Sequence, residues 1–308
     1  MNDALRLIGL EAFKKVVCAD PYEGSSEAQV SSVHFVLKYG PRKGLEDEFA
    51  AYRFVADNLG DEVAVIFPSM VLFSQSANGE AAMVITPVHG RSLEGAILSG
   101  ETEVANQMVE HALDHLDVLH RPVADPQSSL RGFAEELART LEINLRKAGY
   151  KTPTPNFASQ ERFWSRGRVS LAHRDLSAVN IIGDANGVKF IDPRLAVPQA
   201  SGGLGGYASP IIDLVSLAVS LERKEAELKR LFPGRTLQTS RELVRARIDE
   251  AINSDSCTSA LAQLAEAVVR SAYAACRCSY CLAPERAWLY ERMEETTREV
   301  VAILADSV

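Results

Sequence analysis

The sequence predicts an α+β protein in which a small β-rich part is followed by a larger, mainly helical part. Short apolar runs of β-like composition fill most of the first 88 residues, whereas apolar side chains recur at spacings of three and four residues after about residue 90. A hairpin pattern at 179–192 interrupts the helical part. A lone hairpin is only marginally stable in water, so this one is expected to pack on other elements, as hairpins at functional sites often do.

Composition narrows the class of protein. The chain has 308 residues, a formal net charge of −8 and 46% hydrophobic residues, values that exclude a disordered chain and allow one large domain or two moderate ones. The acidic excess disfavours a nucleic-acid partner, because phosphate contacts need a basic face. We expect a cytoplasmic protein with no membrane partner, since there is no apolar span, no signal-peptide pattern and an odd count of five cysteines. The oligomeric state is open.

The runs expected to form strands in the first part lie at 14–19, 28–40, 63–67, 71–76 and 81–86. A turn at Ser31-Ser32 divides the second run into two strands, and Asn78-Gly79 is a strong hairpin turn signal before the last run. Apolar residues from Leu45 to Leu59 recur at helical spacing and predict one helix among these strands. The expected order is therefore strands, helix, strands.

Helices of the second part are expected at 105–119, 133–145, 211–221, 241–252, 258–275 and 285–305. The 211–221 segment is apolar nearly all round, which indicates a buried helix. Gly149 is a candidate C-cap of the second of these helices, and Pro284 lies near the start of the last. The hairpin at 179–192 is interpreted as two strands joined by an Asn186-Gly187 turn.

The strongest chemical signal brackets this hairpin. His173, Asp175 and Asn180 form an H-x-D-x-x-x-x-N pattern before it, and Asp192 follows its second strand. Each aspartate alone is typical of a cap or a turn, but the joint spacing around a hairpin is rarely met by chance. The pattern resembles the catalytic loop and the metal-binding aspartate of the protein-kinase-like fold, and is most similar to the aminoglycoside phosphotransferase and choline kinase branch.

This resemblance implies a bilobal fold, with an N-lobe at 1–88 that binds the nucleotide phosphates and a C-lobe at 89–308 that carries the catalytic loop and the acceptor-binding region. It implies transfer of the γ-phosphoryl group of ATP or GTP to a hydroxyl, with Asp175 accepting the hydroxyl proton. Asn180 and Asp192 would supply oxygen ligands to Mg²⁺, a hard cation that takes one or two carboxylates together with phosphate and water.

The same resemblance assigns phosphate-binding residues upstream. Lys38 ends a β-like run and is expected to hold the α- and β-phosphates, although alone it would most often be a solvated edge lysine. Glu48 best matches the helix glutamate that pairs with this lysine, and Glu46 is the competitor. Ser25 and Ser26 are expected in a loop over the phosphates, where a plain surface turn is the alternative.

The segment 83–93 resembles the hinge between the two lobes of this family, because an apolar strand is followed by a proline-containing link and Gly90. Backbone groups of Thr86 and Val88 are candidates for contacts with the adenine ring. Pro87 cannot make the donor contact, because proline has no backbone N–H.

Two further residues are expected to support the catalytic loop. The resemblance implies that His173 is a structural hydrogen-bonding residue rather than an acid or a base. Asp213 opens the predicted 211–221 helix, where an aspartate of this fold commonly braces the catalytic loop through backbone hydrogen bonds. An ordinary carboxylate at a helix N-terminus is the alternative for Asp213.

The short segment between Asp192 and Asp213 favours a small molecule over a protein as the acceptor. Protein kinases carry a longer activation segment that ends in A-P-E, and here A-P-E occurs only at 283–285, where it looks like a helix start. An aminoglycoside or another antibiotic, a sugar or a natural product are candidates, and Arg174 and Pro193 depart from many aminoglycoside kinases. A protein kinase and an inactive nucleotide-binding regulatory module are the alternative functions.

Acidic side chains in the helical part would suit a cationic acceptor, although a solvated helix face is the ordinary alternative for each: Glu135, Glu136, Glu142, Glu161, Glu291, Glu294 and Glu295. Cys276, Cys278 and Cys281 form a C-x-C-x-x-C pattern that could bind zinc with Cys257 as a fourth ligand. These offsets do not share one helix face, so ordinary buried thiols are favoured.

Overall fold

The computed structural model describes residues 15–20, 25–30, 33–75, 79–121, 130–147, 168–194, 207–254 and 256–275. The predicted helix at 285–305, the candidate cap Gly149 and the cysteine pattern at 276–281 lie outside the described residues. Cys257, the other cysteine considered for zinc, is buried. None of the helices described is long and apolar enough to cross a membrane.

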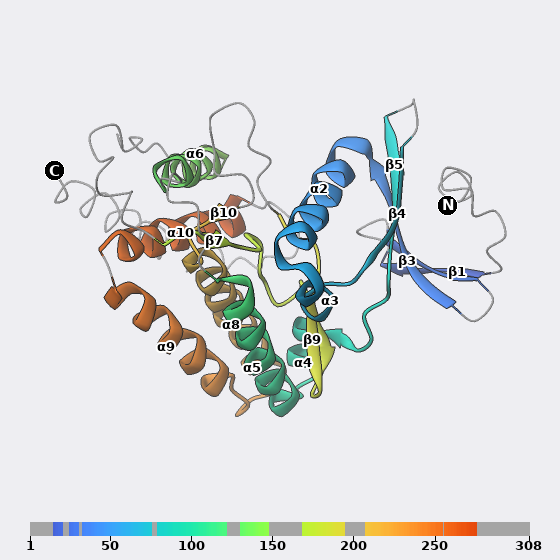
Figure 1. The fold of residues 1–308 in the computed structure, drawn as a ribbon. Coiled ribbons are helices and arrows are strands. Elements are labelled where there is room, and N and C mark those ends of the chain that lie inside the picture. Colours follow the sequence, from blue (N-terminus) through green and yellow to red (C-terminus); the bar gives the residue numbers. More distant parts are fainter. Residues whose placement is uncertain are drawn as a thin grey trace.

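The first part of the chain forms a five-stranded antiparallel sheet (Figure 1). Its strands are β1 (Lys15–Asp20), β2 (Ser25–Val30), β3 (Val33–Pro41), β4 (Met70–Gln75) and β5 (Glu80–Ile85). Their order across the sheet is β1-β2-β3-β5-β4, so β3 and β5 lie side by side at its centre. The prediction that the 28–40 run holds two strands is confirmed.

Helix α2 (Arg42–Leu59) follows β3 directly and lies between the sheet and the helical part (Figure 1). It contains the whole predicted segment from Leu45 to Leu59 and begins earlier, at Arg42. Leu45, Tyr52 and Val55 recur at helical spacing, and all three are buried. The helix ends at Gly60, whose φ of 57° suits a residue without a side chain. This buried face fixes where the carboxylate of Glu48 lies, because Glu48 is on the same helix.

The prediction of a strand at 63–67 is wrong. After a 3-10 turn at Gly60–Glu62, residues Val63–Ile66 form the short helix α3, in which Ile66 is buried and Val65 is exposed. A short apolar run does not distinguish a strand from a buried helical turn, because it is too short to reveal a period. The last carbonyl groups of this turn accept hydrogen bonds from the ammonium of Lys189, which suits the negative end of a helix.

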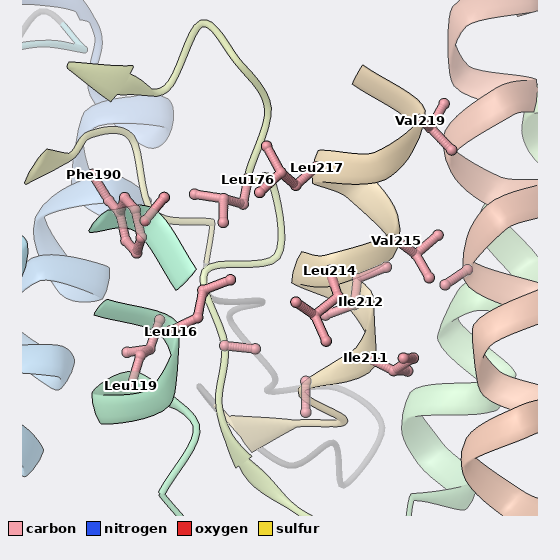
Figure 2. Packing of buried hydrophobic residues seen from close by; sticks show 14 of the residues in the cluster. Leu116, Leu119, Leu176, Phe190, Ile211, Ile212, Leu214, Val215, Leu217 and Val219 are labelled. Carbon is pink, nitrogen blue, oxygen red and sulfur yellow. The ribbon is translucent and has the colours of Figure 1, made fainter. Parts of the chain in front are cut away.

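The second part is mainly helical, as predicted. Its helices are α4 (Leu93–Leu98), α5 (Thr102–Leu119), α6 (Arg131–Lys147), α8 (Ile211–Leu231), α9 (Gln238–Ser254) and α10 (Ser256–Ala275). The first half of α8 is buried nearly all round, and Figure 2 shows its side chains in one buried cluster with Leu116 and Leu119 of α5, Leu176 and Phe190. Leu176, in the segment before the hairpin, is buried in the same cluster, and this apolar burial holds the segment against the helices.

The predicted hairpin is present as β8 (Ile181–Asp184) and β9 (Gly187–Phe190). Its turn consists of Ala185 and Asn186, one residue earlier than predicted, because Asp184 and Gly187 are already paired. The Asn186 N–H donates to the carboxylate of Asp184 at 2.7 Å, so a local side-chain bond stabilises the turn. The short strand β6 (Arg91–Ser92) pairs with β8 and extends the hairpin to a three-stranded sheet, so the hairpin does not stand alone.

Strands β7 (Ser170–Leu171) and β10 (Tyr207–Ala208) pair with each other and so join the segment before the H-x-D-x-x-x-x-N pattern to the start of α8. The predicted boundary between 1–88 and 89–308 falls in the link from β5 to β6, and it stays a prediction.

Gly90 in this link lies directly against the hairpin. Its φ is 107°, and a Cβ at this position would lie 2.1 Å from the carbonyl oxygen of Gly183. Both the backbone conformation and the contact therefore exclude a side chain. A glycine is required here because the link between β5 and β6 passes close to the β8 backbone.

We expect Gly90→Ala to lower the free energy of unfolding by about 3 kcal/mol, because it adds both backbone strain and a clash with backbone atoms. Gly187→Ala is the matched control on the same hairpin, since nothing lies within 4 Å of its added Cβ. This control should change the free energy by less than about 1 kcal/mol. Urea unfolding measures both, and equal effects would contradict the argument.

Candidate functional site

An ammonium group between two carboxylates is the centre of the site. Lys38 Nζ on β3 donates to Glu48 Oε1 of α2 at 2.7 Å and to Asp192 Oδ1 beyond β9. All three side chains are largely buried. The structure thus brings together three predicted site residues that are far apart in the sequence. Glu46, the competitor, pairs instead with Arg42 on the exposed side of the helix.

Burial and charge shift the acidities of this cluster. Burial raises the pKa of Glu48 to about 7, although the neighbouring ammonium of Lys38 opposes the rise. Burial alone would lower the pKa of Lys38, but the attraction of Asp192 and then of Glu48 outweighs it and holds this pKa above its ordinary value. Lys38 therefore stays cationic, as a lysine that binds phosphate must.

Tyr52 is a site residue that the sequence did not reveal as one. It is buried on α2, where its helical spacing predicted a core position, and its hydroxyl lies 3.4 Å from the backbone nitrogen of Asp192. Burial and then the carboxylates of Glu48 and Asp192 hold its pKa well above the ordinary value, so it remains a neutral hydroxyl. Tyr52 supports the position of the Asp192 segment.

The H-x-D-x-x-x-x-N segment lies next to this cluster. The Asn180 side-chain amide donates to the backbone carbonyl of Asp175 at 2.8 Å, and Asn180 is buried. His173 Nε2 donates to the carbonyl of Ile191 at 2.8 Å, which joins the segment to the end of the hairpin. Burial raises the pKa of Asp175, and the guanidinium of Arg194 limits that rise. These contacts hold Asp175, Asn180 and Asp192 in one small region.

Asp213 fixes the backbone of the H-x-D-x-x-x-x-N segment through hydrogen bonds. It is fully buried at the start of α8, and its two oxygens accept the backbone N–H groups of His173 and Arg174, each at 2.7 Å. His120, the residue after α5, donates from Nε2 to the same carboxylate at 3.0 Å. Burial would raise the pKa of Asp213, but the bonds from His120 and His173 outweigh it and lower the pKa. The sequence predicted Asp213 in this place but gave no signal for His120.

Two residues of the site have backbone conformations that favour glycine. Arg174 has a φ of 68° and Asp192 a φ of 56°. Such conformations persist where surrounding bonds impose them, and they cluster at functional sites. The Arg174 side chain turns away from the cluster, since its guanidinium bonds to Glu136 at 2.5 Å and lies 5.2 Å from the ring centre of Phe133.

The two serines expected in a phosphate loop lie in a strand instead. Ser25 and Ser26 are the first residues of β2, because pairing with β1 on one side and β3 on the other continues as far as Ser25. In this register Ser25 is opposite Lys38. Residues 21–24, which precede Ser25, lie outside the described residues.

The link after β5 carries the predicted adenine contacts. The Thr86 N–H donates to the Ser69 carbonyl at 2.8 Å, and the Thr86 hydroxyl accepts from the Ser69 N–H at 2.9 Å. This exchange leaves the Thr86 carbonyl for a ligand. Within the described part of the chain, no hydrogen bond occupies the Val88 N–H. One acceptor and one donor spaced in this way suit the edge of a purine ring.

The donor set at the loop and hairpin end suits a hard cation. The amide nitrogen of Asn180 is used by Asp175, which leaves the amide oxygen of Asn180 as a ligand beside the carboxylate of Asp192. Among the described residues there is no group of three or more His, Cys, Asp or Glu side chains that could hold a metal alone. An amide oxygen, one carboxylate and nucleotide phosphates form a typical set for Mg²⁺.

Some of the acids considered for a cationic acceptor already have partners. Glu136 pairs with Arg174, and Glu142 pairs with Arg146 on the same helix. Glu161, Glu291, Glu294 and Glu295 lie outside the described residues.

Two cavities, of about 590 and 260 Å³, lie elsewhere among the helices. Residues of α8, α9 and α10 line the larger one, and neither cavity is lined by Lys38, Asp175 or Asp192.

The sequence matches no protein-family model and no curated protein sequence. Solved structures do match the fold. One is a thermostable mutant of aminoglycoside phosphotransferase APH(4)-Ia in ternary complex with AMP-PNP and hygromycin B, with 13% identity and a TM-score of 0.52. The match covers 97% of this chain and 98% of that one.

A second match is the same phosphotransferase in a ternary complex with ADP and hygromycin B, again a thermostable mutant. It has 13% identity and a TM-score of 0.51, and covers 96% of this chain and 97% of that one. At this identity the comparison establishes the fold, which is the predicted bilobal arrangement of a small sheet and a larger helical region. The chain therefore has the protein-kinase-like fold of the aminoglycoside phosphotransferases.

Proposed function

We propose that this protein is a Mg²⁺-dependent kinase that transfers the γ-phosphoryl group of a nucleoside triphosphate to a hydroxyl of a small molecule. The observation that carries the proposal is the Lys38–Glu48–Asp192 cluster beside Asp175 and Asn180. Phosphoryl transfer depends mainly on positioning and charge neutralisation, and this cluster provides both. The solved neighbours that hold AMP-PNP or ADP together with hygromycin B support a nucleotide and a small acceptor.

In this mechanism the purine ring of the nucleotide binds to the link after β5, where the Thr86 carbonyl accepts a hydrogen bond and the Val88 N–H donates one. Lys38 binds the α- and β-phosphates, and Glu48 orients its ammonium. Ser25 is paired in register with Lys38 at the start of β2, which supports Ser25 and Ser26 as candidates for phosphate contacts.

Asn180 and Asp192 would hold Mg²⁺, which when bound neutralises phosphate charge and orients the γ-phosphoryl group. Asp175 takes the proton from the acceptor hydroxyl, and its raised pKa makes it a better base than an exposed aspartate. His173 and Asp213 fix the backbone of the loop and exchange no proton with the substrate.

The acceptor is proposed only as a class. An aminoglycoside or another antibiotic, a sugar or a natural product fits a kinase with a short segment between Asp192 and Asp213. Antibiotic resistance would be the biological role if the acceptor is an antibiotic. A screen of hydroxyl-bearing antibiotics and metabolites, with mass detection of the phosphorylated product, would identify it.

Asp175→Asn should lower kcat by about 10³-fold, because the asparagine cannot accept the hydroxyl proton. The dissociation constant for Mg²⁺-ADP should stay within about threefold of the wild type, since the side chain is not placed at the phosphates of that nucleotide. Product formation and titration calorimetry measure the two quantities.

The control for this experiment is Asp57→Asn, because Asp57 is exposed on α2 and has no part in the proposed mechanism. This variant should behave as the wild type in both measurements. Full activity of Asp175→Asn would contradict the assignment of the base.

Glu48 predicts a pH dependence of nucleotide binding. Its pKa of about 7 means that it becomes protonated as the pH falls below that value, and it then no longer attracts Lys38. We expect the affinity for Mg²⁺-ADP to fall as the pH is lowered through 7. The affinity of Glu48→Gln should be about tenfold lower at pH 8 and should change less between pH 8 and 6.

The titration of the nucleotide itself affects both proteins equally, so the difference between the two binding curves isolates Glu48. Glu46→Gln is the matched control, since Glu46 pairs with Arg42 at the surface. A wild-type curve that runs parallel to that of Glu48→Gln would show that Glu48 does not titrate in this range.

A further inference from the structure

An arginine lies on the carboxylate that is assigned as the base. Arg194 follows Asp192 by two residues, and its Nε lies 2.9 Å from Asp175 Oδ2. The Arg194 N–H donates to the His173 carbonyl at 2.9 Å, so its backbone is joined to the catalytic loop. The preceding Ile191 is fixed as well, since its N–H donates to the Asn180 carbonyl at 3.0 Å. The backbone from which the Arg194 side chain extends is thus held in place.

The other cations next to the site are already matched by carboxylates. Lys38 lies between Glu48 and Asp192, and Arg174 is paired with Glu136. The Arg194 guanidinium differs, because Asp175 is its one carboxylate partner within the described residues. Its side chain is 76% exposed, and a guanidinium has five N–H donors. Several of these donors are therefore available to a ligand that reaches Asp175.

The ligand that must come this close is the transferred phosphoryl group. The attacking hydroxyl has to lie within about 3 Å of the Asp175 carboxylate, and its oxygen within about 3.5 Å of phosphorus. A group bonded to the other side of that carboxylate is then within reach of the phosphoryl oxygens. Charge spread over these oxygens in the transition state is stabilised by a planar, bidentate cation.

We propose that Arg194 is a further catalytic residue, which donates hydrogen bonds to the oxygens of the γ-phosphoryl group during transfer. This inference rests on the proposed kinase function. As the acceptor oxygen bonds to the γ-phosphorus, the bond from that phosphorus to the β,γ-bridging oxygen breaks. The electron pair leaves with the nucleoside diphosphate, the hydroxyl proton goes to Asp175, and Arg194 stays protonated throughout.

The test compares Arg194→Ala and Arg194→Lys with the wild type in the full-length protein. The readout is hydrolysis of Mg²⁺-ATP by water, which needs no knowledge of the acceptor, together with transfer to any acceptor that a screen of antibiotics and metabolites provides. We expect kcat to fall about 100-fold in Arg194→Ala. It should fall somewhat less in Arg194→Lys, which keeps the positive charge but loses the planar guanidinium that can donate two parallel hydrogen bonds. The affinity for Mg²⁺-ADP should stay within about threefold.

Two further readouts separate this role from an indirect one. Arg194 also limits the rise of the pKa of Asp175, so its loss would protonate the base at low pH. If that were its whole effect, the defect would vanish at pH 9, whereas loss of a contact to the phosphoryl group persists there. Added guanidinium ion should restore part of the kcat of Arg194→Ala, because it can occupy the vacated place. Arg139→Ala, an exposed arginine on α6, is the matched control and should match the wild type.

Three results would overturn the proposal. The first is an active wild type with Arg194 variants of equal kcat. The second is a defect that disappears at pH 9 or that follows a loss of nucleotide affinity without rescue by guanidinium. The third is a wild type that turns over no nucleotide with water or any acceptor, which would overturn the kinase function and this inference with it. Only the third result leaves Arg139→Ala and the wild type equally inactive.

Discussion

The ammonium group of Lys38 is the interaction on which the rest of the site depends. It binds Glu48 of α2 and Asp192 beyond β9, and so joins the five-stranded sheet to the hairpin of the helical part. A buried ammonium without partners would be costly, as would either carboxylate left alone. The three groups therefore hold one another in place, and the sheet, the helix and the hairpin end are positioned around them.

A second carboxylate supports the other side of the site. Asp213 is buried at the start of α8 and accepts hydrogen bonds from the backbone N–H groups of His173 and Arg174, while His120 at the end of α5 donates to it. Residues of α8 and α5 belong to the apolar core, so these bonds fix the loop to the buried core of the helical part (Figure 2). The unusual φ of Arg174 is one that these bonds impose.

The site also gives a specific meaning to the acidity of the chain. The chain has a net charge of −8, and three of its carboxylates, those of Glu48, Asp175 and Asp192, are concentrated where the proposed nucleotide would bring further negative charge. Lys38 pairs with two of these carboxylates and Arg194 with the third, so two cations face three carboxylates. Binding of a polyphosphate here needs added positive charge, which agrees with a cation at Asn180 and Asp192.

The sequence by itself determined the features that depend on near neighbours. Helical periodicity predicted α2 and α5, the continuous apolar run at 211–221 predicted the start of α8, and turn chemistry predicted the hairpin. The spacing around the hairpin selected Asp175, Asn180 and Asp192, and the family resemblance that this spacing suggested then assigned Lys38 and Glu48. Only the tertiary structure decided that residues 63–67 are helical and that Ser25 and Ser26 lie in a strand, because short runs take the form that their packing partners allow. The roles of Tyr52, His120 and Arg194 rest on contacts between distant segments, and no local pattern encodes such contacts.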